Sequence, residues 1–426
     1  MESSAQTPLP ALRRGLEMFP MEHQGKAMLA LRDMEGLTDE SVALSAQGML
    51  LASFLDGNRA MAEVQSLFAK ATGTFLQPAE IMNLVNQLEK SGFLETPEIE
   101  AKRHKIFEDF LASPVRRPAH QGIGYPENNL ELASVLGAFF QDPKGPGKTI
   151  PAAPVSTVSP VGLFGPHIDF LRGGPAYAWA YQALAESPPP DVIVALGVAH
   201  ASPNSPWVMT TKAYETPYGP MNVDLGLYES IKSHLWYDPR DDEWVHRGEH
   251  SLEFQAVWLK YLWRDKTPPW VPILCSSFDR FCPDKPPSTV ESVEKAVAGI
   301  GEMLAERARK GQKILILAGV DLAHVGPAFG DDMTMGPDVE KKVEAEDRKS
   351  LEHVLTLESD PFYLSVVEGD HWRKVCGLSA LYTSLRWIKA LGNGSLPQGK
   401  LLTYGQAPDP RGGIVSFASG IFSKKL

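Results

Sequence analysis

The chain has few cysteines, only 3 among 426 residues, so a disulfide framework does not hold it together. Free thiols are typical of a reducing compartment, and the cytoplasm is the simplest setting. No run of about 18 apolar residues is present, which predicts that no transmembrane helix forms. Residues 1–4 do not begin a basic segment followed by an apolar core, so we expect no signal peptide.

The chain also lacks net positive charge. Its formal net charge is -11, from 41 lysines and arginines against 52 aspartates and glutamates. Nucleic acids and anionic membranes attract basic surfaces, so the composition argues against either as the main partner. Hydrophobic residues make up 43% and charged residues 22%, as in an ordinary globular protein. The length allows two or three domains.

Three apolar runs in the second part of the chain lead to histidines. The runs are residues 161–164, 192–197 and 314–319, and the residues that follow them are His167, His200, Asp321 and His324. Helix-like stretches alternate with these runs, which predicts an α/β domain. Ligands bind such domains outside the carboxyl ends of the strands. One histidine there could be a surface or capping residue, but three together favour a site.

The first part of the chain has a different pattern. Between residues 42 and 95, apolar residues recur at helical spacing in three stretches, separated by turn signals at residues 56–57 and 73. We therefore predict a small, mostly helical domain with its linker over residues 1–113, and the α/β domain over residues 114–426. Within the first part, the initial dozen residues are predicted to be a loose tail and residues 98–116 the linker.

Two stretches of the first domain carry a resemblance. Residues 54–59 (FLDGNR) and 88–95 (LEKSGFLE), with a helix between them, resemble a winged helix of the PqqD-like kind. Such modules bind peptides in some peptide-modifying systems, so the resemblance implies a peptide- or protein-binding role. A helical domain that only packs or dimerises fits the same residues. The acidic residues of this region make DNA a poor partner.

Seven side chains of the second domain are candidates for chemistry: His167, His200, His250, Glu253, Asp321, His324 and Cys376. Two neutral imidazoles and a thiolate suit iron(II), copper or zinc, and do not suit calcium or magnesium. Cys376 lies at a predicted helix start, which would favour its thiolate. A buried apolar cysteine, or a nucleophilic pair with a histidine, fits the same residue. Cys275 and Cys282 match no zinc-binding spacing, and we expect them to be structural.

Five motifs at these residues occur in the order found in the Memo family, which is also named for AmmeMemoRadiSam system protein B. They are GPH at 165–167, GVAH at 197–200, EHSLE at 249–253, DLAH at 321–324 and CG at 376–377. The resemblance covers roughly residues 114–426 and implies a fold similar to class III extradiol dioxygenases. It also implies a metal held by His167, His200 and Cys376. The chain departs from the family at Ala201 and Gln255, where Memo proteins often carry histidine.

These observations lead to a set of expected roles. His324 would be a general acid/base, and Asp321 would orient His324 or a ligand imidazole. His250 and Glu253 would line the pocket; a salt bridge for Glu253 and a helix cap for Asp321 are the alternatives.

The predicted function is a mononuclear non-haem iron(II) oxidoreductase, dioxygenase-like, with copper or zinc as alternative metals and a small organic molecule or a peptide as substrate. The alternative is a non-catalytic metal-binding adaptor that recruits a peptide or protein partner, such as a radical-SAM enzyme, through its N-terminal domain.

Overall fold

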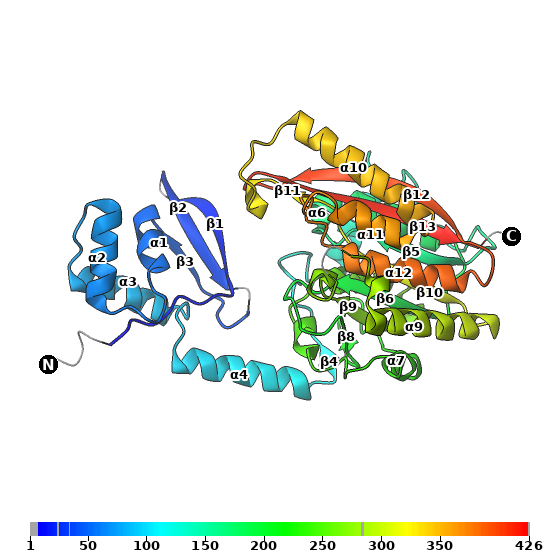
Figure 1. Cartoon of the computed structure of the whole chain (residues 1–426), viewed down its shortest axis with the longest axis horizontal. Helices are drawn as coiled ribbons and strands as arrows, with labels where there is room; N and C mark the ends of the chain where they lie inside the picture. The colour runs from blue at the N-terminus through cyan, green and yellow to red at the C-terminus, as the bar shows by residue number, and fades with distance from the viewer. Residues whose placement is uncertain (1–6, 24, 34, 283–284, 425–426) are drawn as a thin grey trace. The chain divides into compact units, whose positions relative to one another are not determined.

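The computed structural model describes residues 7–424 apart from residues 24, 34, 283 and 284. The chain forms two compact units, Met1–Ala112 and Ser113–Leu426 (Figure 1). Within the described residues, no helix combines the length and the apolar character needed to span a bilayer.

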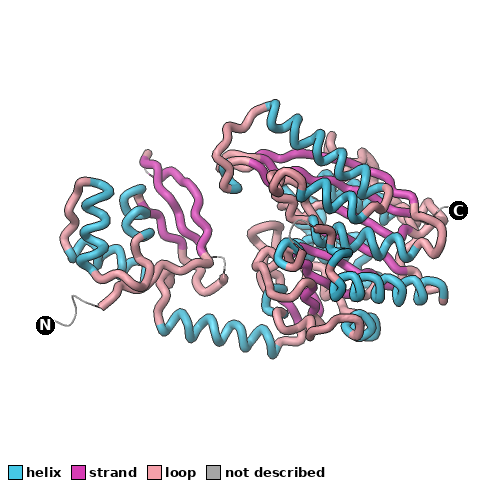
Figure 2. Tube along the Cα trace, in the orientation of Figure 1, coloured by secondary structure: helices cyan, strands magenta, loops and turns pink. Residues whose placement is uncertain are grey.

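The first unit contains an antiparallel sheet followed by helices (Figure 2). The strands β1 (Leu16–His23), β2 (Lys26–Asp33) and β3 (Ser41–Leu44) pair in that order. The helices are α1 (Ala46–Ser53), α2 (Met61–Thr72), α3 (Pro78–Lys90) and α4 (Pro97–Ala112). Strand residues such as Leu31 and helix residues such as Phe68 share one buried core.

The prediction of a mostly helical first unit is correct for residues 46–90 and misses the sheet. β1 and β2 are interrupted by charged residues and proline, so they lack the strict apolar alternation that marks a strand. Part of the predicted tail is ordered, because Leu12 bridges Leu94 and Leu9 is buried. Most of the predicted linker, residues 98–112, is helical. It forms helix α4, which buries Ile99 and Phe110.

The second unit is built on one mixed sheet of eight strands (Figure 1). Its strands are β5 (Pro160–Gly165), β6 (Val192–Val198), β7 (Trp207–Met209), β9 (Trp270–Cys275), β10 (Ile314–Gly319), β11 (His324–Val325), β12 (Gln398–Pro408) and β13 (Ile414–Ser423). The spatial order is β11-β13-β5-β10-β6-β9-β7, and β12 pairs with β13. β5, β10, β6 and β9 run parallel, and the outer strands are antiparallel to their neighbours. A separate pair joins β4 (Val115–Arg116) to β8 (Ala213–Tyr214).

Helices cover both faces of this sheet, and the central strands are buried throughout. In β6, Ile193 and Ala195 face a core shared with α5 (Asn129–Phe139), α6 (Phe170–Ala185) and α8 (Ser251–Trp263). Val192, Val194 and Leu196 face the opposite core. That core includes residues of α7 (Leu225–Lys232), α9 (Glu291–Arg309), α10 (Pro337–Leu355), α11 (Ser359–Val367) and α12 (Leu378–Leu391). Short 3₁₀ helices lie at Glu243–His246, Arg264–Lys266, Phe278–Arg280, Pro287–Thr289 and Pro327–Phe329. This arrangement confirms the predicted α/β class.

Sheet order explains why distant motifs meet. β10 lies between β5 and β6, and all three run parallel. The carboxyl ends of the three strands therefore lie at one edge of the sheet. His167, His200 and Asp321 each follow one of these ends, so the fold brings them to the same place.

Candidate metal centre

His167 is the innermost residue of the centre. It follows β5, its side chain is only 2% exposed, and its Nδ1 lies 3.1 Å from the carbonyl oxygen of Gly319, to which it donates. This bond leaves Nε2 unprotonated in the neutral ring. Burial and the nearby His200 lower the pKa of His167 to about 3. The ring is therefore neutral near pH 7 and presents a free nitrogen lone pair.

His200 is oriented by a buried carboxylate. Its Nδ1 lies 3.0 and 3.1 Å from the two oxygens of Glu249, and its backbone N–H donates to the same carboxylate at 2.9 Å. Burial would lower the pKa of His200, but Glu249 raises it well above 6.5. Burial would likewise raise the pKa of Glu249, but His200 holds it well below 4.5. Because Nδ1 faces Glu249, Nε2 of His200 points to the other side.

His250 shares the same carboxylate. It is the residue before helix α8, and its Nδ1 lies 3.3 Å from Oε1 of Glu249. The rings of His200 and His250 stack with centroids 4.9 Å apart and an interplanar angle of 17°. One carboxylate thus faces Nδ1 of two parallel imidazoles, as carboxylate–histidine pairs do around metal ions. Burial lowers the pKa of His250, which keeps it neutral near pH 7.

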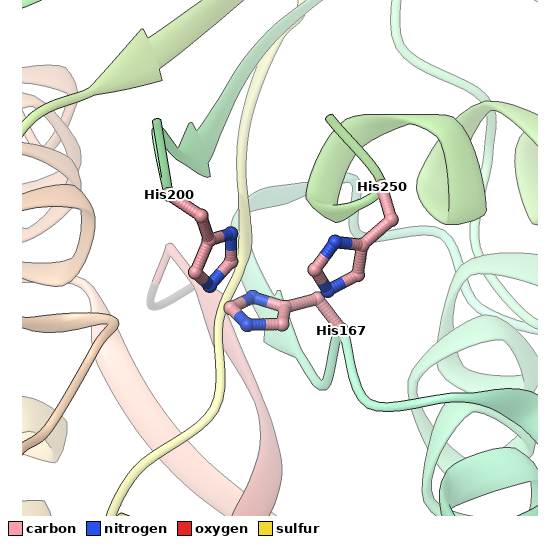
Figure 3. Close-up of side chains that lie close together, drawn as sticks. All are labelled: His167, His200 and His250. Carbon is pink, nitrogen blue, oxygen red and sulfur yellow. The ribbon is translucent and has the colours of Figure 1, made fainter. Parts of the chain in front are cut away.

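The three rings converge (Figure 3). One nitrogen from each of His167, His200 and His250 lies within 4.8 Å of the others. The His167 ring stands perpendicular to both others, at centroid distances of 5.1 Å from His200 and 5.2 Å from His250. Three converging imidazoles could hold a metal ion, and nitrogen ligands of this kind suit zinc, copper and iron.

Cys376 borders this cluster. Its Sγ lies 3.4 Å from Nε2 of His167 and 3.8 Å from the carbonyl oxygen of Asp321. Burial raises the pKa of the thiol, and the neighbouring His200 opposes that rise. A sulfur donor therefore lies beside two of the three imidazoles. The expected ligand set of His167, His200 and Cys376 stays a prediction, and His250, expected only to line the pocket, joins the histidine cluster.

Asp321 and His324 lie at the same edge. Asp321 accepts a bond from the backbone N–H of His167 at 3.0 Å, and its other oxygen lies 3.6 Å from Nε2 of that ring. Burial raises the pKa of Asp321 to about 6. Nδ1 of His324 donates to the carbonyl of Leu322 at 3.1 Å, and burial lowers its pKa while Asp321 opposes the change. Strand β11 follows Asp321, so the helix-cap alternative for this residue is wrong. The acid/base role of His324 stays a prediction.

Glu253 has a different environment from the predicted one. Its carboxylate is fully buried, pairs with Arg116, and accepts bonds from the Tyr125 hydroxyl at 2.6 Å and from the backbone N–H groups of Ala119 and His120, each at 2.9 Å. The salt-bridge alternative therefore describes it, although the partner is a distant arginine. The expected role of Glu253 as a pocket-lining residue stays a prediction.

Sequence reasoning missed three residues of this region. Glu249 was within the EHSLE motif but had no assigned role, and Arg116 was assigned to the linker. Gln255 was noted only as a departure from the family. Its side-chain amide donates to the carbonyl of Pro166 at 2.7 Å and accepts a bond from Tyr181 at 2.8 Å, so it holds the turn before His167. Cys275 and Cys282 are free and buried, as expected of structural cysteines.

Comparison with known proteins identifies the family of the chain. The family described as Memo-like protein matches residues 116–421. A MEMO1 family protein from Aquifex aeolicus is 26% identical over 408 residues, covering 96% of this chain and 99% of that protein. MEMO1 family protein TTHA0924 from Thermus thermophilus is 29% identical over 273 residues, covering 64% of this chain and 74% of that protein. The family match spans the α/β unit and every residue of the centre, and the chain therefore belongs to the Memo family.

Proposed function

We propose that this protein binds iron(II) at the His167, His200 and His250 cluster beside Cys376, and is a dioxygenase-like oxidoreductase. Copper and zinc are the alternative metals, and the substrate is a small organic molecule or a peptide. The observation that supports the proposal most is the orientation of the rings. Nδ1 of His167 faces a carbonyl and Nδ1 of His200 faces a carboxylate, so both Nε2 atoms are left for a metal.

The donor set fits a borderline metal. Imidazole nitrogen and thiolate sulfur select iron, copper or zinc over calcium and magnesium, which prefer oxygen. Bound iron(II) would supply Lewis acidity and one-electron exchange. The chain itself would supply proton handling through Asp321, whose pKa near 6 lets it take or give a proton around neutral pH, and through His324.

Metal analysis of the protein purified without oxygen tests this proposal. We expect about one iron per chain in the parent and strong loss of iron in His200→Ala. His353→Ala is the matched control, because His353 lies on α10, pairs with Glu358 just before α11, and takes no part in the cluster. Zinc at the same stoichiometry would favour hydrolytic or structural chemistry instead. Absence of metal in the parent, under conditions that preserve iron(II), would contradict the proposal.

The second candidate is a metal-binding adaptor. The first unit has its own buried core, as a separate recognition module requires. The Aquifex aeolicus relative aligns over 96% of this chain, so its match includes most of this unit as well. In this proposal the unit acts as a PqqD-like module that binds a peptide or protein. We propose a radical-SAM enzyme as this partner.

His167→Ala separates the two candidates. An enzyme would lose oxygen consumption in this variant, and an adaptor would keep partner binding with no turnover in the parent. For either candidate we propose a cytoplasmic setting, because all three cysteines are free and a reducing compartment keeps both thiols and iron(II) reduced.

A further inference from the structure

A second layer of buried charge lies behind the histidine cluster. The guanidinium of Arg116 is completely buried and pairs with the equally buried carboxylate of Glu253. Arg116 also stacks over the ring of Tyr214, with its central carbon 4.8 Å from the ring centroid. Nothing in the proposed chemistry uses this pair directly. A buried ion pair often adds little net stability to a fold. The role of this pair is therefore inferred from the other hydrogen bonds that Arg116 and Glu253 make.

Arg116 holds the backbone that carries the metal-centre residues. Its Nε donates to the carbonyl of His246 at 2.9 Å, and Nη2 donates to the carbonyl of Glu249 at 2.8 Å. These two carbonyls lie at the ends of the short turn that leads into helix α8. The second belongs to the residue whose carboxylate faces both His200 and His250. One planar side chain therefore fixes the start and the end of this turn.

Glu253 extends the same arrangement to the other side of His250. It accepts the backbone N–H groups of Ala119 and His120, and so fixes His120 in place. The His120 ring bonds the carbonyl of Gly248 at 3.0 Å and packs edge-on against His250 with centroids 5.5 Å apart. The turn from 246 to 250 is thus held by Arg116 from one side and by His120 from the other.

We propose that Arg116 is a positioning residue for the metal centre: by binding the carbonyls of His246 and Glu249, it aims the Glu249 carboxylate that orients His200 and His250. This inference rests on the proposed metal-binding function. It assigns no chemistry to Arg116, whose guanidinium donates to the carbonyls of His246 and Glu249 and to the Glu253 carboxylate. Arg116 thus acts through Glu249 on the orientation of the His200 and His250 rings.

The variant Arg116→Lys keeps the positive charge of this side chain and removes its ability to position the turn. Lysine keeps a positive charge for Glu253, but its single ammonium cannot reproduce the planar fork that spans two carbonyls and a carboxylate. We expect cobalt(II) to bind this variant about 10- to 100-fold more weakly than the parent, measured by competition with a chromophoric chelator. Arg13→Lys is the matched control. Arg13 is also buried and also bonds a carboxylate (Asp33) and a carbonyl (Gly92), but it lies in the first unit.

A second readout needs no metal. In the metal-free parent, labelled with ¹⁵N-histidine, His250 should be the Nδ1–H tautomer that faces Glu249, with its signal assigned through His250→Gln. In Arg116→Lys this signal should shift toward a mixture of tautomers, and in Arg13→Lys it should not change. Parent-like cobalt affinity together with a parent-like His250 signal in Arg116→Lys would overturn the inference, as would equal losses in both variants. A parent that binds no cobalt would refute the proposed function, and the tautomer signal would still decide the role of Arg116.

Discussion

Replacement of Glu249 by glutamine should weaken metal binding, because this one carboxylate orients the imidazoles of both His200 and His250. The two carboxylate oxygens accept from Nδ1 of His200, from the backbone N–H of His200 and from the backbone N–H of Ser251. One of them, Oε1, also lies 3.3 Å from Nδ1 of His250. Every one of these neighbours is a donor. Glutamine offers only one acceptor oxygen, so its amide N–H₂ must face a donor.

The expected magnitude follows from this conflict. The variant relieves it when an imidazole changes tautomer and places its proton on Nε2, where a metal would bind. Changes to such outer partners weaken metal binding about 10- to 100-fold, or roughly 1.4–2.7 kcal/mol. The charge matters as well. Glu249 raises the pKa of His200, so a metal that binds the protonated imidazole must displace its proton.

The release of this proton determines how metal affinity changes with pH. In the parent, metal affinity rises with pH until it passes the raised pKa of His200. In Glu249→Gln, His200 loses the carboxylate that raises its pKa, so the rise should flatten at a lower pH than in the parent. Calorimetric titration with cobalt(II) in two buffers of different ionisation enthalpy measures both the affinity and the protons released. Glu243→Gln is the control, since Glu243 is equally buried but bonds Thr210 and Arg240. Parent-like affinity and proton release in Glu249→Gln would refute this reasoning.

Three further predictions address other parts of the molecule. Cys376→Ser should abolish the sulfur-to-metal absorption of the cobalt(II) protein while the three imidazoles still retain the ion; a parent spectrum without that band would exclude thiolate ligation. Gly377→Ala should lower the melting temperature by roughly 2–8 °C, because an added Cβ would lie 2.6 Å from the carbonyl oxygen of Asp321, a packing conflict worth about 1–3 kcal/mol. Gly336→Ala, which meets nothing within 4 Å, is its control, and tryptophan fluorescence follows both; equal melting temperatures of the two variants would contradict the prediction. For Asp33, burial would raise the pKa, but bonds from Arg13 and backbone N–H groups lower it below 3.8. Its stabilising contribution is therefore present above pH 3.8 and disappears as the pH falls through the lowered pKa. Hydrogen exchange at Leu31 should show this acid loss in the parent and a weaker pH dependence in Asp33→Asn, and identical pH profiles would contradict it.

The sequence predicts the central parallel strands and the residues that follow them, but it does not predict the small sheet of the first unit. Buried parallel strands have continuous apolar runs, so β5, β6 and β10 were visible, and the residues after them could be placed together. Helices α2 and α3 were visible because their apolar residues recur at helical spacing between glycine signals. β1 and β2 were missed because a small, partly exposed sheet does not impose strict alternation on its strands.

The partners of the candidate residues could not be predicted for a different reason. Arg116 and Glu253 are 137 residues apart, and no local pattern signals a buried ion pair over that distance. The motif EHSLE contains two glutamates, and the sequence offered no means to tell which one faces the histidines. Helix geometry decides it: Glu249 precedes the helix and turns toward His200, while Glu253 lies one turn later and faces Arg116. The charged residues 98–112 suggested a linker, but a helix can present charge to solvent and still bury Ile99 and Phe110.

Anomalous X-ray diffraction from a crystal of the protein prepared without oxygen tests the central claim most directly. Data collected on both sides of the iron absorption edge locate and identify the metal at once. We predict one iron peak within bonding distance of Nε2 of both His167 and His200, about 2.0–2.1 Å as for metal–imidazole bonds in proteins. Well-ordered His167 and His200 side chains with no iron peak beside them, or an iron peak only at other residues, would contradict this prediction.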